Sequence, residues 1–421
     1  MKFAHFLALF LCLGLLAHAG NTTPSPAIVT PSEPWVTPTL DIRLRYEYGD
    51  INSPALQSAN ALTVRERIGL VTRDIYGFSA LIEGEFLQVI TNRYDSGPGA
   101  STYPNNPNLT GIYDPKTNEL NQAYLQYDSS DTLIRAGRQR IILDNAAFVG
   151  NVGWRQNEQT YDAFSIQNEC IDDLKLFYAY ANRANRIFGS YATGALRSFA
   201  GDINLFNASY TGFGDATLTA YAYLMNFDKT AANAGYISNN TYGLIATSPL
   251  GPVTLYAELA LQTNTSSSPP TKPDETGYAH LYASAEAGES TFTLGWEYLG
   301  AGFVTPLATV HSFNGYADAF INPRIGLVTN PGLNDLHLRH ALPLPFWDLN
   351  FTQTIHLFGD NNSRFDYGWE YDLTLSKKFN EHFVAITKLA YFDSAGPTAG
   401  PIPNPAPFDT TRVSLELNYH F

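Results

Sequence analysis

The stretch Leu40–Tyr48, LDIRLRYEY, alternates apolar with charged side chains at almost every step. Successive side chains of a β-strand point to opposite faces, so one face of this segment suits lipid and the other suits water. Such two-residue alternation is typical of strands that cross a membrane as part of a closed barrel, where lipid-facing and lumen-facing residues follow one another. The stretch therefore predicts a transmembrane strand.

The same rhythm continues to the end of the chain. Segments of about ten residues alternate in polarity and are separated by short turns and long polar loops in alternation. Counting the segments gives about eighteen, an even number as single-chain bacterial barrels require. We predict an all-β fold for residues 40–421, a transmembrane antiparallel β-barrel of about 18 strands with short periplasmic turns and long extracellular loops.

The N-terminal residues have a different character. Residues 1–19 combine one lysine, an apolar run and a small-residue cleavage motif before Gly20, which indicates a secretory signal peptide. Residues 20–39 are rich in proline and are expected to form a periplasmic lead. No later stretch is apolar for long enough to cross a bilayer as a helix. Cys170 is the only cysteine after the signal, so no intramolecular disulfide is expected.

The C-terminal segment Thr411–Phe421 alternates in the same way and ends in an aromatic residue. It resembles the assembly signal of bacterial outer-membrane barrels, although an edge strand of a soluble protein could end similarly. The resemblance implies the outer membrane of a Gram-negative-type bacterium as the location, with outer-membrane lipid and the barrel-assembly machinery as partners. We expect a monomer.

The charge of the chain is acidic overall and basic locally. The formal net charge of −14 argues against nucleic acid as a partner. Ten of the seventeen arginines nevertheless lie before residue 156. A local positive field can therefore exist inside an acidic protein.

The stretch Arg135–Ile166, RAGRQRIILDNAAFVGNVGWRQNEQTYDAFSI, reads as a basic strand, a loop that contains glycine and asparagine, and a second polar strand. Arg138 and Arg140 are two residues apart, so a strand would point both to one face. The loop at residues 143–156 would then bring further polar side chains beside them. We predict that this loop folds inward and narrows the lumen; the alternative is a polar hairpin tip in solvent.

Three blocks, residues 59–86, 119–165 and 305–323, resemble the alginate export family of outer-membrane porins. They cover roughly a quarter of the chain. The resemblance implies a porin barrel whose basic lumen passes an anionic polyuronate. Together with the alternation, it gives these predicted pore-lining or substrate-binding residues: Arg43, Arg45, Arg65, Arg67, Glu83, Glu85, Arg138, Arg140, Asp144, Asn145, Arg155 and Gln156.

The predicted function is an outer-membrane channel for hydrophilic, preferentially anionic solutes, including export of an alginate-like acidic oligosaccharide or polysaccharide. Arginine suits such a wall because its charge does not titrate and its planar fork binds carboxylates. Glu83 and Glu85 face the same lumen, so the arginines could instead pair with them and with Asp41 and Glu47. A general non-specific porin, a surface adhesin and a barrel enzyme are also compatible with the sequence.

Catalytic and metal sites are not expected. His311 and Ser312 are adjacent, so on an extended chain their side chains point apart and form no dyad. The remaining histidines are dispersed, and their spacing matches no recognised zinc site. The sequence therefore predicts no enzyme activity, no metal and no cofactor.

Overall fold

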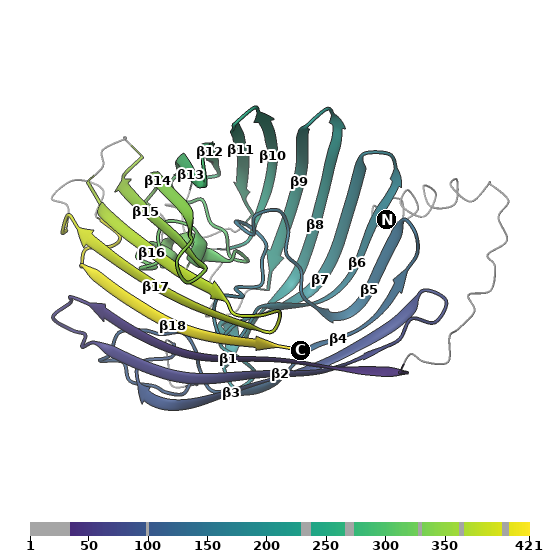
Figure 1. Cartoon of the computed structure of the whole chain (residues 1–421), viewed down its shortest axis with the longest axis horizontal. Helices are drawn as coiled ribbons and strands as arrows, with labels where there is room; N and C mark the ends of the chain where they lie inside the picture. The colour runs from purple at the N-terminus through teal and green to yellow at the C-terminus, as the bar shows by residue number, and fades with distance from the viewer. Residues whose placement is uncertain are drawn as a thin grey trace.

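The computed structural model describes residues 34–97, 101–228, 237–265, 273–326, 331–361, 366–397 and 404–421. Over these residues eighteen strands form one antiparallel sheet, which closes on itself because β1 pairs with both β2 and β18 (Figure 1). The predicted fold class and strand number are confirmed. The predicted signal peptide, residues 1–19, lies outside the described residues, as does most of the predicted lead.

The strands are β1 (Val36–Ile51), β2 (Ala59–Thr72), β3 (Phe78–Arg93), β4 (Thr117–Asp128), β5 (Thr132–Gln139), β6 (Thr160–Ile171), β7 (Leu174–Asn185), β8 (Ser198–Phe213), β9 (Ala216–Phe227), β10 (Asn239–Leu250), β11 (Val253–Asn264), β12 (Glu275–Ala287), β13 (Ser290–Leu299), β14 (Leu333–Leu344), β15 (Leu349–Gly359), β16 (Gly368–Lys378), β17 (Phe383–Ser394) and β18 (Thr410–His420). Short helical turns are α2 (Gly194–Arg197), η2 (Val310–Ser312) and α3 (Ile321–Arg324). None of the helices among the described residues is long and apolar enough to cross a membrane.

The first strand begins earlier than the sequence predicts. β1 starts at Val36, so residues 36–39 of the predicted lead belong to the barrel. Pro38 lies opposite Leu70 of β2, whereas the register of β1 with β18 begins only at Asp41. Proline has no N–H to donate, and a position with a ladder neighbour on one side tolerates it.

The outer face of the wall is apolar. Ile82, Leu125, Leu244 and Leu259 are each more than half exposed on it. Exposed aromatic side chains lie near the short turns and the C-terminus, at Tyr76, Phe78, Phe213, Phe346, Trp347, Phe379 and Phe421. An apolar band with an aromatic girdle is how transmembrane barrels meet the bilayer and its interface.

The core of the molecule lies inside the barrel, because long loops fold into it. Residues 140–159 and 300–326 contribute Phe148, Phe303, Leu307 and Phe320 to one buried cluster with wall residues such as Tyr221. Figure 1 shows loop segments within the ring of strands. Phe148 packs against Tyr221 and Tyr278, with ring centroids 5.5 and 5.1 Å apart. The prediction that the loop after Arg140 enters the lumen is confirmed.

The barrel closes where the first and last strands meet. The backbone N–H of Leu40 donates to Phe421 O at 3.0 Å, and the N–H of Phe421 donates to Leu40 O at 2.8 Å. These bonds complete the β1–β18 seam at the end that carries the short turns. In hydrocarbon such bonds have no water to replace them.

Deleting Phe421 should lower the amount of folded barrel in the outer membrane severalfold, because it removes both terminal seam bonds and the terminal aromatic ring. The measurement is the heat-modifiable fraction on a gel of outer membranes. Phe379→Ala is the matched control, since it removes an exposed aromatic ring at another turn without touching the seam. Equal folded fractions for the deletion and for Phe379→Ala would contradict the expectation.

Candidate functional site

A balanced cluster of buried charges joins the inward loops to the wall. We call it the ionic cluster; it consists of Arg43, Arg45, Arg155 and Arg412 with Glu47, Asp114, Asp318 and Glu416. Glu47 is its centre and lies 3.0 Å from Arg45, 3.0 Å from Arg155 and 3.3 Å from Arg412. Burying so many charges is tolerable only because each has opposite charges close by.

The cluster connects separate parts of the chain. Arg155 comes from the loop at residues 140–159, and it lies 3.2 Å from Asp318 of the loop at residues 300–326. Asp114 comes from the loop at residues 94–116 and accepts a hydrogen bond from Gln156 N at 3.0 Å. Three inward loops are therefore fixed to one another and to the wall by the same set of ion pairs.

A second ionic group lies beside the first. Glu158 accepts from Arg140 Nε at 2.7 Å and lies 3.6 Å from Arg67, which in turn donates to Glu85 at 2.5 Å. Burial alone would raise the pKa of Glu158, but Arg67 and Arg140 lower it to about 2. This carboxylate therefore stays ionised and holds the loop at all ordinary pH values.

Most of the predicted arginines are consequently structural. Arg45, Arg65, Arg67 and Arg155 are at most 6% exposed, too little to contact a passing solute. The pairing that the sequence left open is largely what occurs: Arg45 pairs with Glu47, Arg65 with Asp41 and Arg67 with Glu85. Glu83 differs, because it accepts from the amides of Asn121 and Gln122 instead.

The Arg43 side chain holds the loop at residues 140–159 by binding backbone carbonyls of that loop. Its guanidinium donates to the carbonyls of Gly153 and Arg155, both at 3.0 Å, and to that of Trp154 at 3.2 Å. Gln156 donates to Thr63 Oγ1 at 2.8 Å on the neighbouring strand. The turn at residues 153–156 is therefore pinned to β1 and β2.

The structure contradicts the predicted position of Arg138 on the lumen face. It lies opposite Ala123 on β4 and Asp162 on β6, and its Nε donates to Asp162 at 2.6 Å. The adjacent Gln139 lies opposite Tyr161, which is fully buried against the inward loop, so alternation puts Arg138 on the outer face. β5 ends at Gln139, and Arg140 leaves the ladder and turns inward. The two arginines therefore do not share a face.

The two largest inward loops contact each other directly. Gly150 N donates to Leu307 O at 2.9 Å, and Thr309 N donates to Ala146 O at 3.0 Å. A Cβ atom at Gly150 would overlap Thr309 Oγ1. Glycine suits this point because the side chains of Thr309 and Ala146 occupy the space that a Cβ atom would need.

A stack of rings lies between the inward loops and the wall. Trp154 and His311 are parallel, with ring centroids 3.3 Å apart, and the centroid of the Tyr316 ring lies 4.9 Å from that of His311. The Arg45 guanidinium lies 3.7 Å from the centroid of the Trp154 ring. Lys388 of β17 lies 4.4 Å from the Tyr316 ring. Cation–π contacts of this kind favour a fixed ring position.

His311 is held in one orientation by Asp318, whose Oδ1 lies 3.0 Å from His311 Nδ1. Burial lowers the pKa of His311 to about 3 and outweighs the neighbouring carboxylate. Burial would raise the pKa of Asp318, but His311, Arg155 and Arg412 hold it below its usual range. At neutral pH the pair is therefore a neutral imidazole beside a carboxylate.

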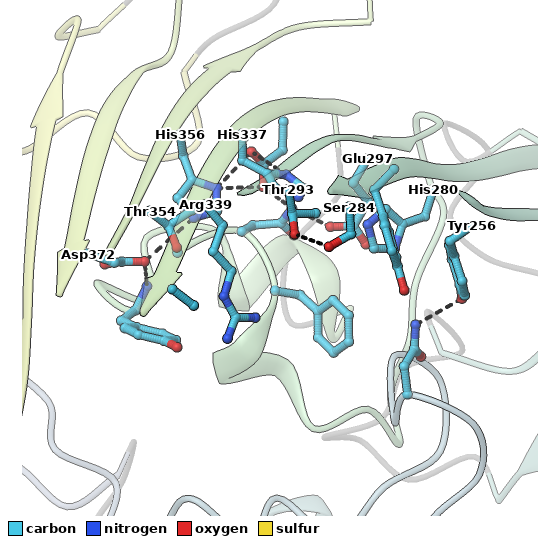
Figure 2. A pocket seen from close by; sticks show the side chains of 18 of the residues that line it. Tyr256, His280, Ser284, Thr293, Glu297, His337, Arg339, Thr354, His356 and Asp372 are labelled. Atoms are coloured by element: carbon cyan, nitrogen blue, oxygen red, sulfur yellow. Dashed lines mark hydrogen bonds and ion pairs between the residues drawn. The ribbon is translucent and has the colours of Figure 1, made fainter. Parts of the chain in front are cut away.

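Cavities lie along the lumen between the loops and the wall. The outer cavity, about 230 Å³, is lined by loop residues including Trp154 and Phe188. The histidine cavity, about 670 Å³, lies along β11–β16 (Figure 2). A gap of about 10 Å³ is lined by Trp154 and Tyr316, which also line the outer and the histidine cavity respectively. The ring stack therefore separates these two larger spaces.

A further space, the basic cavity, is about 340 Å³ and lies along β5–β8. Among its lining side chains Arg135, Arg140 and Lys175 are cationic and Asp144 is the acid. Asp144 accepts from Asn207 at 2.8 Å and from Tyr223 at 3.0 Å. The neighbouring Asn145 donates to Tyr256 Oη at 3.1 Å and borders the histidine cavity.

Sequence reasoning missed several residues of this lumen. Arg135 and Lys175 line the basic cavity, although only their alternation with apolar neighbours could have identified them. His280, His337 and His356 line the histidine cavity with Asp335 and Asp372. The spacing of Asp335 and His337, two residues apart on one strand face, was the sequence feature that could have indicated this group. Its partners on other strands could not be identified without the register.

Comparisons with known proteins support the fold. No family model and no curated protein sequence matches the chain. The crystal structure of Acinetobacter baumannii OccAB4 is similar, with a TM-score of 0.64, 14% identity and coverage of 93% of this chain and 100% of that one. A BenF-like porin from Pseudomonas fluorescens Pf-5 is similar with a TM-score of 0.63 and 15% identity, and the match covers 92% of this chain and 99% of that one. The outer membrane protein opdK from Pseudomonas aeruginosa is similar with a TM-score of 0.60 and 13% identity, and the match covers 91% of this chain and 99% of that one.

The chain therefore has the same barrel fold as these proteins, which include a porin and an outer membrane protein. The sequence resemblance to porins is supported at this level. Its narrower form, the resemblance to alginate exporters, is not reflected in these similar structures.

Lowering the pH from about 7 to 4.5 should weaken docking of the two loops. His311 has its ordinary pKa near 6.5 when undocked and about 3 when docked, so the undocked form binds more protons between these values. Docking is fully stable above about 6.5 and loses on the order of 1 kcal/mol per pH unit below it. The contribution of Asp318 is lost only below its ordinary value of 3.8.

The measurement is acrylamide quenching of Trp154 in a protein whose other tryptophans are replaced by phenylalanine. Quenching should increase at the lower pH in this protein. His311→Phe keeps a ring in the stack and removes the titrating group, so its quenching should vary less with pH. The idea fails if the two proteins respond identically.

Proposed function

We propose that this protein is an outer-membrane channel that passes hydrophilic solutes and prefers anionic ones. The observation that carries the proposal is a porin barrel whose lumen is narrowed, but not filled, by loops tied to its wall. Polar cavities of about 670 and 340 Å³ remain beside the loops.

The ring stack supports a selective rather than a general channel. The gap beside Trp154 and His311 has a volume of about 10 Å³, roughly the room that one water molecule needs. Solutes that follow this route require a small displacement of the loop tips. A general non-specific porin would leave a wide aqueous channel instead.

The preference for anions rests on the basic cavity. Arg135 has no carboxylate partner among the described residues, and it donates only to the amide oxygen of Gln126 at 2.7 Å. Lys175 is about half exposed and lies 3.6 Å from Glu169, an arrangement that neutralises little of its field. These two side chains can therefore meet a carboxylate or sulfate on a solute as it passes.

Export of an alginate-like polysaccharide is the narrower form of the proposal. The three sequence blocks support it, and a polyuronate would suit the basic cavity. A polymer chain would, however, need the loops to undock and the ionic cluster to open. Small anionic solutes require less movement, and we therefore place them first.

Replacing Arg135 by glutamine should lower the anion-to-cation permeability ratio, because it removes an unpaired positive charge from the lumen. The measurement is the reversal potential in a salt gradient across planar bilayers. The effect should shrink at about 1 M salt, where the screening length falls to about 3 Å. Arg138→Gln is the matched control, since it makes the same change three residues away on the outer face.

A wild-type channel that prefers cations would contradict the anionic preference. Equal shifts in Arg135→Gln and Arg138→Gln would show that the lumen position of Arg135 is irrelevant. Absence of channels under all conditions would contradict the channel function itself and favour an adhesin.

Replacing Gly150 by valine should raise single-channel conductance severalfold, because its side chain would overlap Thr309 and separate the two loops. Gly277→Ala is the control, since the nearest atom to an added Cβ there is 3.9 Å away. Both proteins should keep heat-modifiable mobility. Unchanged conductance in a folded Gly150→Val protein would place the conducting path elsewhere.

A further inference from the structure

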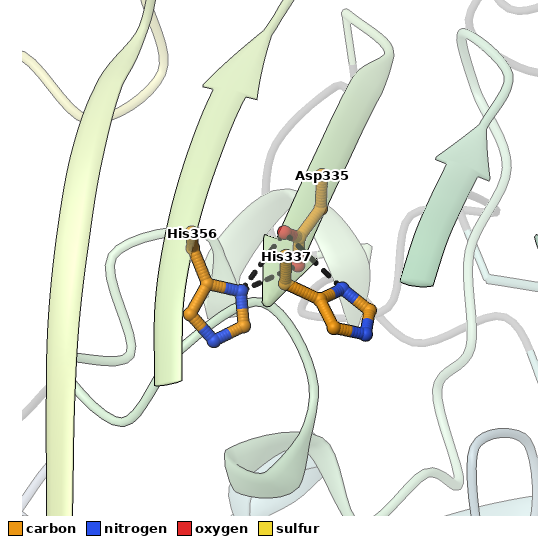
Figure 3. Close-up of side chains that lie close together, drawn as sticks. All are labelled: Asp335, His337 and His356. Atoms are coloured by element: carbon orange, nitrogen blue, oxygen red, sulfur yellow. Dashed lines mark hydrogen bonds and ion pairs between the residues drawn. The ribbon is translucent and has the colours of Figure 1, made fainter. Parts of the chain in front are cut away.

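The histidine cavity contains a cluster of metal-ligating side chains that the channel proposal does not use. Asp335 and His337 of β14 and His356 of β15 offer ligand atoms that all lie within 4.8 Å of one another. Figure 3 shows the Nδ1 atoms of both imidazoles turned toward the Asp335 carboxylate. His356 Nδ1 lies 2.9 Å and His337 Nδ1 3.6 Å from Asp335 Oδ1.

Strand pairing creates this cluster. His337 and His356 are register partners on β14 and β15. Asp335 is two residues before His337, so it lies on the same face of β14. Three ligands are thus placed by the wall of the barrel and not by a mobile loop.

We propose that Asp335, His337 and His356 bind one divalent transition metal ion of the zinc class. Zinc bonds of about 2.0–2.1 Å to nitrogen and oxygen in a tetrahedron place ligand atoms about 3.4 Å apart. The two imidazole nitrogens lie 3.6 and 2.9 Å from Asp335 Oδ1, on either side of that value, and all three ligand atoms lie within 4.8 Å of one another. Two imidazoles with one carboxylate suit zinc or its neighbours better than calcium or magnesium, which take oxygen ligands.

Neighbouring side chains are placed to orient the three proposed ligands. His356 Nε2, on the far side of the ring, lies 3.6 Å from Asp372 Oδ2. A metal-bound histidine commonly directs its other ring nitrogen to a carboxylate, which fixes the ring. Asp335 Oδ2 accepts from Asn314 Nδ2 at 3.1 Å. A bound ion would therefore also hold the inward loop that carries Asn314.

A neighbouring histidine gives an independent indication. His280 is 8% exposed and lines the same cavity, yet neither of its ring nitrogens finds a hydrogen-bond partner among the described residues. Its ring centroid is 6.0 Å from that of His337. Buried polar atoms without partners are costly and call for an explanation such as a missing ion or water. His280 is placed to bind a water or anion carried by the ion.

The backbone also leaves room for the His337 ring. Gly295 of β13 is the register partner of His337, and a Cβ atom there would overlap His337 Nε2. Glycine in a strand interior weakens the strand, and it often marks a close approach of another group. Here the approaching group is the ring of a proposed ligand.

The test is a titration of the full-length, chelator-treated protein, folded in detergent and free of any histidine tag. Zn²⁺ is added in competition with a chromogenic chelator, and Co²⁺ is added separately to record its visible spectrum. We expect one ion per chain and a tetrahedral Co²⁺ spectrum. Asp372→Asn should lower affinity about 10–100-fold, as loss of an orienting partner does.

Removing a ligand should cost more than removing Asp372. His337→Ala and His356→Ala should each weaken Zn²⁺ binding further and abolish the tetrahedral Co²⁺ spectrum. Gly295→Ala should weaken binding although it removes no ligand. His340→Ala is the matched control, because His340 lies on the same strand but on the opposite face, stacked on Phe292.

Heat-modifiable mobility confirms that each variant is folded. The proposal is overturned if the wild type binds no Zn²⁺, or if the His337→Ala/His356→Ala double variant titrates like the wild type. It is also overturned if His340→Ala weakens binding as much as His337→Ala. None of these readouts requires channel activity, so they remain decisive whatever the protein transports.

Discussion

The structure depends first on the requirement that backbone hydrogen bonds in hydrocarbon be satisfied within the protein. An open sheet edge would leave N–H and C=O groups without partners, and each would cost several kcal/mol. The closed sheet of the described chain removes that edge, and the Leu40–Phe421 bonds complete it. Closure then forces the alternation of every strand, because one face meets lipid and the other meets the lumen.

Inward loops occupy part of the lumen. Loops that enter it bring backbone groups and charges that need partners, and the wall supplies them. The ionic cluster around Glu47 neutralises four arginines with four carboxylates and joins three loops to β1 and β18. The sequence suggested that these arginines attract solute. In the structure most of them form buried ion pairs that hold the inward loops to the wall, because a buried charge needs an opposite charge close by.

Two of the cavities in the lumen differ in their chemistry. The basic cavity carries Arg135 and Lys175, and the histidine cavity carries imidazoles and carboxylates from β12–β16. Both are lined in part by the loop at residues 140–159. An ion in the histidine cavity would offset the carboxylates there, and it would hold Asn314 through Asp335. Loop position and lumen charge would then depend on metal occupancy.

The sequence alone determined the fold class and the approximate number of strands, because these follow from local alternation, and it predicted the inward loop while leaving a hairpin tip in solvent as the alternative. It could not determine which residue of the neighbouring strand lies opposite a given residue. Arg138 points outward because alternation from the buried Gln139 places it on the outer face, and His337 meets His356 because β14 and β15 pair in one particular register. Such juxtapositions depend on strand register, turn length and closure together, and only the tertiary structure fixes all three.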